Sequence, residues 1–345
     1  MISFTVLAAA LPALLLLWYF RSRDRNPEPS RVVWTTFLLG VVIVLPILVV
    51  ARPATDFAAS IRNPLASSLA DAFLAAAIPE EFFKFLVLTL YAARHKEFDE
   101  PMDGVVYGAV VSLGFAAFEN ILYCLDGSVT TQVARALTAV PAHSFTGAIM
   151  GYYVGRAKFG GDEGRGRLML KGLAIATLLH GLYDFPLMAL DQARRAGTED
   201  ALGGWALLLL GMPVAVLVSE GRWAHHLVRD LGLEQDRALL LANGPDRHAE
   251  AAALTHSPGP FGIAVRVAVR IMAGTVLVLA GAFVSLGLVL VRLDEHARGD
   301  TSLGVFLVAL GGFGLLPAWG GVRMFRSGLH RLHGTPPERV ASSLG

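Results

Sequence analysis

Several stretches of about 20 residues in this sequence contain almost no charged side chain, and this feature constrains the fold more than any other. A helix rises about 1.5 Å per residue, so each stretch can cross a hydrocarbon core about 30 Å thick. Charged residues make up only 17% of the 345 residues, whereas an average soluble domain carries roughly 25%. The sequence therefore argues against a soluble enzyme, a disordered chain and a fibrous protein.

Backbone N–H and C=O groups find no water in lipid, so the membrane-crossing segments are expected to be helices that satisfy these groups internally. The sequence predicts an all-α fold, a polytopic membrane helix bundle with about nine transmembrane helices. A cleaved signal peptide begins with basic residues, but no lysine or arginine precedes Phe20 here. The first span is therefore interpreted as a membrane anchor. The expected spans are residues 1–20, 32–50, 66–93, 104–124, 136–155, 169–190, 201–219, 267–291 and 302–321.

Connections rich and poor in lysine and arginine alternate along the chain. Cytoplasmic connections are enriched in these residues, so we expect the N-terminus outside and the C-terminus in the cytoplasm. The formal net charge is only +1, and it indicates no nucleic-acid partner. Of the lysines and arginines, 21 lie in the connections 21–31, 94–103, 156–171, 221–270 and 322–345, and 7 in the other four.

The composition changes after residue 220, where charges and a Pro258-Gly259-Pro260 linker signal appear. We predict a seven-span catalytic membrane unit over 1–220 and a cytoplasmic amphipathic segment with linker over 221–265. A two-span C-terminal unit is expected over 266–322, followed by a disordered cytoplasmic tail over 323–345.

Seven ionisable side chains fall well inside four consecutive predicted spans. An Asp or Lys in the middle of a transmembrane helix costs about 2.5–3.5 kcal/mol on insertion scales. Such residues normally face the bundle interior and mark a functional path. A structural polar network that holds helices together is the alternative interpretation. The seven residues are Glu80, Glu81, Lys84, Glu119, His143, His180 and Asp184.

Their spacing favours a shared centre. Lys84 lies four residues after Glu80 and three after Glu81, so it can neutralise either carboxylate on one helix. The two glutamates are about 100° apart, so one is expected to face a reaction centre while the other is paired structurally. The sequence does not show which. His180 and Asp184 share one helix face, where Asp184 can reach the centre or orient the imidazole.

Small residues at steps of four predict two close helix-packing seams, because they let a neighbouring helix approach. One seam runs from His143 through Gly147, Gly151 and Gly155. The other consists of Gly104, Gly108, Ser112, Ala116 and Asn120.

This set of side chains suits hydrolysis in two ways. Two histidines and a carboxylate can hold a catalytic divalent metal such as zinc, and a free glutamate then takes a proton from its bound water. Without a metal, a glutamate activates water while His, Asn or Asp stabilises the oxyanion. No HExxH is present, so metal ligands would come from different helices. The predicted ligands are His143, His180 and Asp184; the predicted catalytic residues are Glu80, Glu81, Glu119 and Asn120, with Lys84 as charge partner.

The motifs follow one another in a recognisable order over about residues 30–220. They resemble the motif series of the PrsW family of intramembrane proteases, which is distantly similar to the CAAX prenyl protease and Abi proteins. The matching segments are Glu80-Glu81-Phe82-Phe83-Lys84, Asp103-Gly104, Gly114 through Asn120, Pro141-Ala142-His143 and His180-Gly181-Leu182-Tyr183-Asp184.

The resemblance implies a bacterial multi-pass metallopeptidase of the inner membrane. Its expected substrate is a membrane-anchored protein, an anti-sigma factor, that it cleaves first on the extracytoplasmic side. The expected cofactor is a divalent metal, with zinc favoured, although the CAAX-type relatives leave a metal-free glutamate mechanism open. The resemblance implies functional roles for Glu80, Glu81, His143, His180, Glu119 and Asp184.

Two other functions use the same residues. A proton- or ion-coupled carrier relays protons along buried carboxylates and histidines, but carriers often show inverted repeats and no internal repeat is visible here. A non-catalytic binding or scaffold protein is the third hypothesis.

Overall fold

The computed structural model describes residues 2–242, except 127–128, 162–163 and 198–204. The chain divides into two compact units, Met1–Leu254 and Thr255–Gly345, and all described residues belong to the first. The predicted spans 267–291 and 302–321, the unit 266–322 and the tail 323–345 therefore lie outside the described residues.

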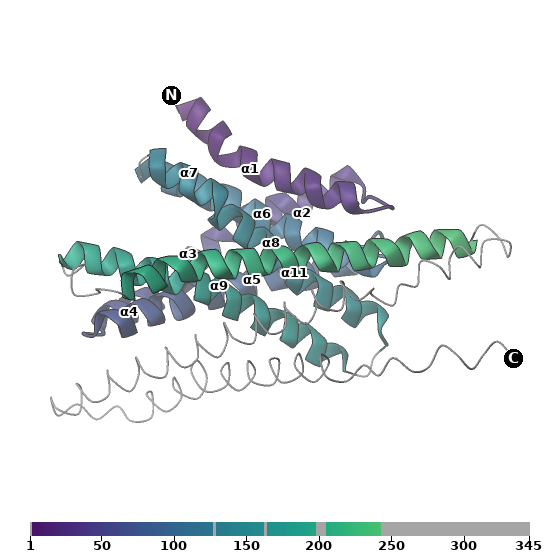
Figure 1. Cartoon of the computed structure of the whole chain (residues 1–345). Helices are drawn as coiled ribbons and strands as arrows, with labels where there is room; N and C mark the ends of the chain where they lie inside the picture. The colour runs from purple at the N-terminus through teal and green to yellow at the C-terminus, as the bar shows by residue number, and fades with distance from the viewer. Residues whose placement is uncertain (1, 127–128, 162–163, 198–204, 243–345) are drawn as a thin grey trace, which may run out of the picture. The chain divides into compact units, whose positions relative to one another are not determined.

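The described part of the chain is built from helices and contains no strand (Figure 1), which confirms the all-α prediction. By length and composition, three helices within it could cross a membrane: Ser30–Ser60, Pro101–Tyr123 and Arg165–Ala196. The total of nine spans and their orientation stay predictions. In chain order the helices are α1 (Ile2–Arg23), α2 (Ser30–Val42), α3 (Val44–Ser60), α4 (Pro64–Ala70), the π-helix η1 (Asp71–Ala77), α5 (Ile78–Leu90), the short 3₁₀ turn η2 (Ala92–Arg94), α6 (Pro101–Asp126), α7 (Val129–Leu137), α8 (Ala139–Phe159), α9 (Arg165–Ala196) and α11 (Trp205–Ala242).

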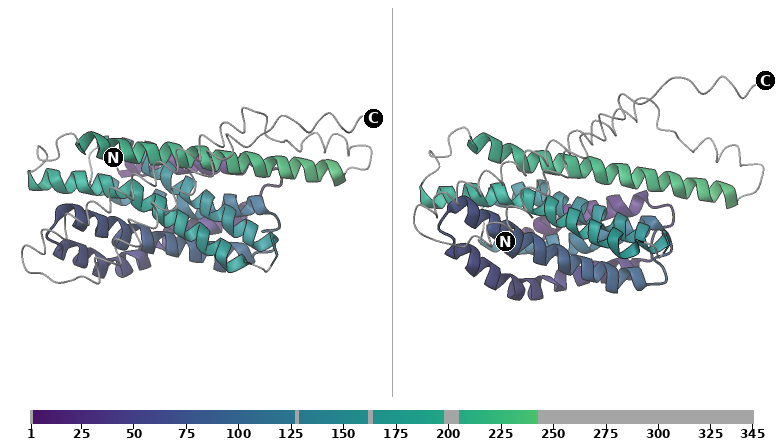
Figure 2. Two further views of the ribbon diagram at one scale, coloured as in Figure 1. Left: turned by 60° about the horizontal axis from the view of Figure 1, so that its bottom comes forward. Right: turned by 90° about the horizontal axis from the view of Figure 1, so that it is seen from below.

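The ends of the helices follow local sequence signals. Asn63 precedes α4, and its side chain accepts a hydrogen bond from the Ala66 amide at 3.1 Å, with Pro64 at the first helical position. Helix α9 ends at Gly197, whose φ of 65° lies in the left-handed region that favours glycine. The last described helix, α11, continues beyond the expected span 201–219 and packs along α9 and α8 (Figure 2).

Helix α6 occupies the middle of the bundle, and glycines let α8 approach it closely. A Cβ added to Gly104 would lie 2.3 Å from the Gly151 carbonyl oxygen, and one added to Gly108 would lie 2.2 Å from that of Gly147. The two predicted small-residue seams therefore pack against each other, as expected for helices in lipid.

A second pair of glycines brings α2 against α6. A Cβ on Gly40 would lie 2.1 Å from the Val111 carbonyl oxygen, and one on Gly114 would lie 2.0 Å from that of Phe37. Helix α6 is thus held by α8 and by α2. These contacts are between backbone atoms, so they cannot be relieved by a change of side-chain rotamer. They therefore fix the position of α6, the helix that carries Glu119 and Asn120.

Helices α2 and α3 present large apolar side chains outward. Monomeric soluble proteins rarely expose contiguous apolar patches of more than a few hundred square ångströms, so this face fits contact with lipid. The exposed residues include Trp34, Leu38, Leu45, Leu48 and Val49.

A π-helix leads directly into the helix that carries the paired glutamates. The Ile78 amide bonds to the Phe73 carbonyl, five residues back, which closes the wide turn of η1. Pro79 follows and has no amide to donate. Such π-turns are frequent at functional sites, where they change the direction in which the following side chains point.

We expect Gly108→Ala to lower the free energy of unfolding by about 1–3 kcal/mol, because the new methyl group overlaps the backbone of α8. Thermal unfolding in detergent measures this loss. Gly211→Ala is the matched control, since Gly211 also lies in a helix but has nothing within 4 Å of its added Cβ. An equal effect of both changes would contradict the close packing of α6 and α8.

Candidate active site

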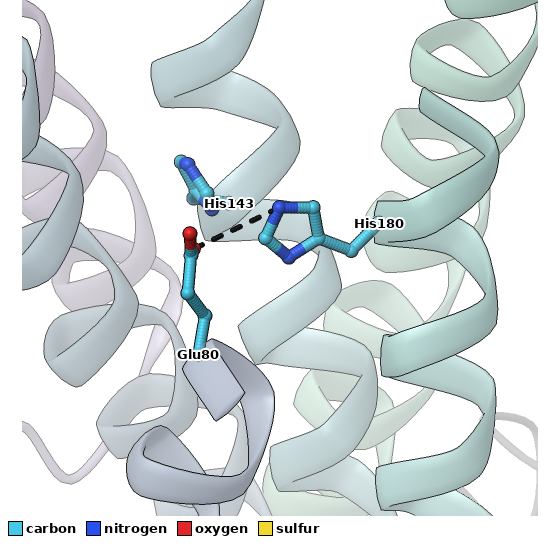
Figure 3. Close-up of side chains that lie close together, drawn as sticks. All are labelled: Glu80, His143 and His180. Carbon is cyan, nitrogen blue, oxygen red and sulfur yellow. Dashed lines mark ion pairs between the residues drawn. The ribbon is translucent and has the colours of Figure 1, made fainter. Parts of the chain in front are cut away.

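The predicted ionisable residues meet inside the bundle. Helix α5 supplies Glu80, Glu81 and Lys84, α6 supplies Glu119, α8 supplies His143, and α9 supplies His180 and Asp184. Figure 3 shows three of these side chains, which come from α5, α8 and α9 and point toward one another. Four helices thus contribute to one cluster.

The structure distinguishes the two adjacent glutamates. Glu81 is fully buried, accepts a hydrogen bond from Lys84 Nζ at 2.7 Å, and lies 2.9 Å from His180 Nδ1. Glu80 Oε2 lies 3.6 Å from Lys84 Nζ and 3.7 Å from His180 Nε2. Among the described residues this oxygen has no hydrogen-bond partner. Glu81 is therefore the paired carboxylate, and Glu80 is the one that faces the centre.

Lys84 is the one lysine of the cluster, is completely buried, and contacts side chains of both α5 and α8. Its ammonium group lies 3.1 Å from His143 Nδ1 in addition to its bond to Glu81. It also lies 4.3 Å from the centre of the Phe115 ring, a favourable cation–π distance. The positive charge of Lys84 thus pairs closely with Glu81 and lies near Glu80 as well.

The ring of His143 lies between a donor and an acceptor. Its Nδ1 faces Lys84, and its Nε2 lies 3.0 Å from Glu119 Oε2. An ammonium group only donates and a carboxylate only accepts, so this arrangement selects the neutral ring with its proton on Nε2. His143 therefore links Lys84 to Glu119 through hydrogen bonds.

The ring of His180 has a carboxylate at each nitrogen. Glu81 Oε1 lies 2.9 Å from Nδ1, while Asp184 Oδ2 lies 3.0 Å from Nε2. The two histidine rings are 5.0 Å apart, edge to face. As the sequence suggested, Asp184 reaches the imidazole from the same helix, and its side chain is 21% exposed at the edge of the cluster.

Two charged residues near the cluster escaped the sequence analysis. Arg135 of α7 pairs with Glu119 Oε2 at 2.8 Å and lies over the Tyr123 ring. The sequence pattern places Arg135 in a connection between two spans, and it does not predict the short helix α7. Glu220 of α11 is completely buried and faces the Thr146 hydroxyl at 3.2 Å. It lies one residue beyond the expected span, so the sequence carried no signal for it.

The donor atoms of Glu80, His143 and His180 lie within 4.8 Å of one another, close enough to share a metal ion. Two imidazoles with one carboxylate are a common zinc set. The structure thus groups Glu80 with the two histidines; Asp184 lies beside them, 3.0 Å from His180 Nε2, and its role as a ligand stays a prediction. Nε2 of His180 faces the carboxylates of Asp184 and Glu80. A metal ion bound between these groups can take the place of the proton on Nε2. Glu81 then supports the ring from Nδ1, as carboxylates do for metal-binding histidines.

Asn120 is completely buried on α6, next to Glu119. Its predicted role at the oxyanion stays a prediction.

Comparison with known proteins identifies relatives for the larger part of the described chain. Residues 28–218 match a family described as PrsW family intramembrane metalloprotease. The chain is 42% identical over 186 residues to Protease PrsW of Geobacillus kaustophilus, covering 54% of this chain and 80% of that protein. It is 40% identical over 190 residues to Protease PrsW of Bacillus subtilis, covering 54% and 85%. Identity to Protease PrsW of Clostridioides difficile is 30% over 217 residues, covering 61% and 85%. No solved structure matches the chain significantly.

An all-α membrane fold with a buried cluster of glutamates and histidines, taken together with these matches, defines an intramembrane protease. The chain belongs to the PrsW family, which confirms the resemblance seen in its motifs.

The different surroundings of the adjacent glutamates predict different effects on stability. Glu81→Gln should lower the free energy of unfolding by about 3 kcal/mol, because the buried Lys84 loses its main partner. Glu80→Gln should cost about 1 kcal/mol or less, since Glu80 makes no hydrogen bond to Lys84. Thermal unfolding in detergent compares them, with the exposed Asp191→Asn on α9 as the control. A larger loss for Glu80→Gln would contradict this assignment.

Proposed function

We propose that the chain hydrolyses a peptide bond of a membrane-anchored protein at the cluster of Glu80, His143 and His180. The observation that carries the proposal is the Glu80 carboxylate, which is buried and faces two histidines. Its Oε2 has no hydrogen-bond partner in the part of the chain that the structure describes. A buried polar atom of this kind needs a partner, and a water molecule or a metal ion supplies one.

Glu80 acts on the water nucleophile in this proposal. Glu80 is adjacent to Glu81, whose carboxylate is paired with Lys84, and the Lys84 ammonium group lies 3.6 Å from Glu80 Oε2. A positioned carboxylate within reach of water serves as a general base, a contribution of about 10²–10⁴ in rate.

Glu80, His143 and His180 would hold the divalent metal that the family description implies. The metal would supply a Lewis acid and a bound water whose pKa is lowered to about 7. In that case Glu80 binds the ion, and Glu119 or Asp184 is left as the carboxylate that receives the proton. His143 can join only if its ring turns away from Lys84 or Glu119, because both of its nitrogens are engaged.

The other charged residues position these groups. Glu81 holds the His180 ring through Nδ1, and Lys84 keeps Glu81 in place. Arg135 holds Glu119 against the His143 ring. A hydrogen-bonded network of this kind fixes the directions of the imidazole rings before substrate arrives, and such positioning is a requirement for efficient catalysis.

The finer features of the function follow the family resemblance and the charge pattern. We propose about nine spans with the N-terminus outside, in the cytoplasmic membrane of a bacterium, as the bacterial relatives suggest. The proposed substrate is a membrane-anchored anti-sigma factor that is cut first on its extracytoplasmic side. The metal is proposed to be zinc, because imidazole and carboxylate ligands suit it.

Cleavage of a tagged, membrane-anchored anti-sigma factor co-expressed with the chain tests the proposal. Glu80→Gln should reduce cleavage at least about 100-fold, because it removes the general base of the metal-free mechanism or, with zinc bound, a ligand of the metal. Glu81→Gln should reduce it about 10- to 100-fold by loosening the His180 ring. The amount of cleaved product on immunoblots gives both values.

Asp191→Asn serves as the control for this experiment, because it removes a carboxylate from α9 in an exposed ion pair away from the cluster. Its cleavage should equal that of the unchanged protein. Unchanged cleavage in both glutamate variants would overturn the proposed active site.

Metal analysis of the purified chain tests the ligands separately. We expect one zinc ion per chain, and loss of most of it in Glu80→Gln and His180→Ala, since each removes one of three proposed donors. Asp191→Asn should retain its zinc. Equal metal content in all four proteins would overturn the ligand assignment, and full cleavage by a zinc-free protein would establish the metal-free glutamate mechanism.

A further inference from the structure

A second cluster of carboxylates lies where α1 ends and α6 begins, away from the candidate active site. Oxygen atoms of Asp24, Glu100 and Asp103 lie within 4.8 Å of one another. Asp24 follows α1, and Asp103 is in the first turn of α6. Asp103 and Glu119 are 16 residues apart on α6, or about 24 Å at 1.5 Å per residue. The two clusters are therefore separate.

Within the described ranges, the hydrogen bonds to these three carboxylates come from neutral amide groups. Gln235 Nε2 donates to Asp24 Oδ1 at 2.6 Å and to Glu100 Oε1 at 2.5 Å. The amides of Asp99 and Glu100 both donate to Asp103 Oδ2 at 2.7 Å. Asn26 adds one bond to Asp24 and one to Glu100.

No lysine or arginine of the described chain forms an ion pair with Asp24, Glu100 or Asp103. The nearby Lys158 donates instead to the Phe98 carbonyl and lies 4.5 Å from the Phe98 ring centre. A fourth carboxylate, Glu28, adds negative charge and accepts a bond from the Tyr107 hydroxyl at 2.8 Å. Among the described residues, basic side chains such as Lys158 therefore act on these carboxylates only at longer range, without an ion pair.

Two of the carboxylate oxygens are buried and receive no hydrogen bond from an N–H or hydroxyl group of the residues that the structure describes, although the Asp103 carboxyl lies within hydrogen-bond reach of Glu28. They are Asp24 Oδ2 and Asp103 Oδ1. Asp24 is 6% exposed and Asp103 is 0% exposed, so bulk water does not serve them. A carboxylate oxygen in such surroundings costs free energy unless a cation or a proton satisfies it. These two atoms are evidence for a ligand that is independent of the clustering itself.

We infer that Asp24, Glu100 and Asp103 bind a hard divalent cation, Mg²⁺ or Ca²⁺. Every donor is an oxygen, which suits these ions and not a zinc ion that prefers nitrogen or sulfur. The limit of 4.8 Å is about twice the metal–oxygen distance of Ca²⁺, about 2.4 Å, so the three atoms fit around one ion. Glu100 is only partly buried and gives the ion a path from solvent.

The bound cation links three parts of the fold. It joins the α1–α2 connection to the start of α6, and Gln235 extends the link to α11 through its bonds to Asp24 and Glu100. A cation that binds only the folded chain stabilises it by mass action. The site is thus a tie between helices that are distant in the sequence, and it takes no part in the proposed hydrolysis.

Thermal unfolding and Mn²⁺ electron paramagnetic resonance of the purified full-length chain in detergent test this inference. After treatment with a chelator, Mg²⁺, Ca²⁺ or Mn²⁺ should raise the Tm, while NaCl of equal ionic strength should not. In His180→Ala, which lacks one proposed ligand of the candidate active site, one Mn²⁺ should bind and be displaced by Mg²⁺ or Ca²⁺. Asp103→Asn and Asp24→Asn should weaken this binding at least about tenfold, because each removes a ligand.

Two controls separate the site from its surroundings. Asp236→Asn removes a carboxylate that pairs with Arg25 in the same region, and it should bind Mn²⁺ as the unchanged chain does. His180→Ala should also retain this ion, because it alters only the candidate active site. If Asp103→Asn does not fold, Glu100→Gln provides the same test at a partly exposed position.

In the absence of divalent cations, Asp103→Asn should be at least as stable to thermal unfolding as the unchanged chain, since repulsion among the carboxylates is reduced. Mn²⁺ affinity within twofold of the unchanged chain in Asp24→Asn and Glu100→Gln would overturn the site. A Tm that responds to acid but not to divalent ions would also overturn it, because protons would then be shared among the carboxylates.

Discussion

The ion pair between Lys84 and Glu81 is the interaction on which the arrangement of the centre depends. Both side chains are completely buried, so neither charge is served by water. The ammonium group also touches the His143 ring, while the carboxylate touches the His180 ring. One pair on a single helix therefore orients imidazoles that belong to two other helices. Breaking such a pair costs more than forming it gains, and this asymmetry keeps the centre in one arrangement.

This arrangement is possible only because the helix backbones lie very close together. Glycines bring α8 and α2 against α6 at distances where a methyl group would overlap a carbonyl oxygen. Side chains of ordinary length, such as Glu119 and His143, then reach one another across the narrow gap between α6 and α8. In lipid, where apolar side chains gain little by meeting each other, this close packing replaces the hydrophobic effect as the source of helix association.

The residues of the centre were predictable from the sequence, but the partner that each one contacts was not. A charge inside an apolar span is costly, and this cost alone identified Glu80, Lys84 and His180 as interior residues. Helical spacing showed that the adjacent glutamates face different directions, yet which one faces the histidines depends on the rotation of α5. The sequence also grouped Asp184 with the histidines; in the structure Asp184 lies beside His180, and Glu80 lies near both histidines. Contacts from a short helix, such as that of Arg135, require tertiary packing that no local pattern contains.

The π-helix before α5 gives the segment 71–77 an unusual tolerance of changes in chain length. One residue more or less changes the phase of a regular helix by about 100°, which equals the angle between adjacent glutamates. A π-turn holds one residue more than an α-turn, so a single-residue deletion within 71–77 can restore a regular α-helix and leave α5 in its present rotation. The same deletion in the regular helix just before Glu80 would instead present a different carboxylate to the imidazoles.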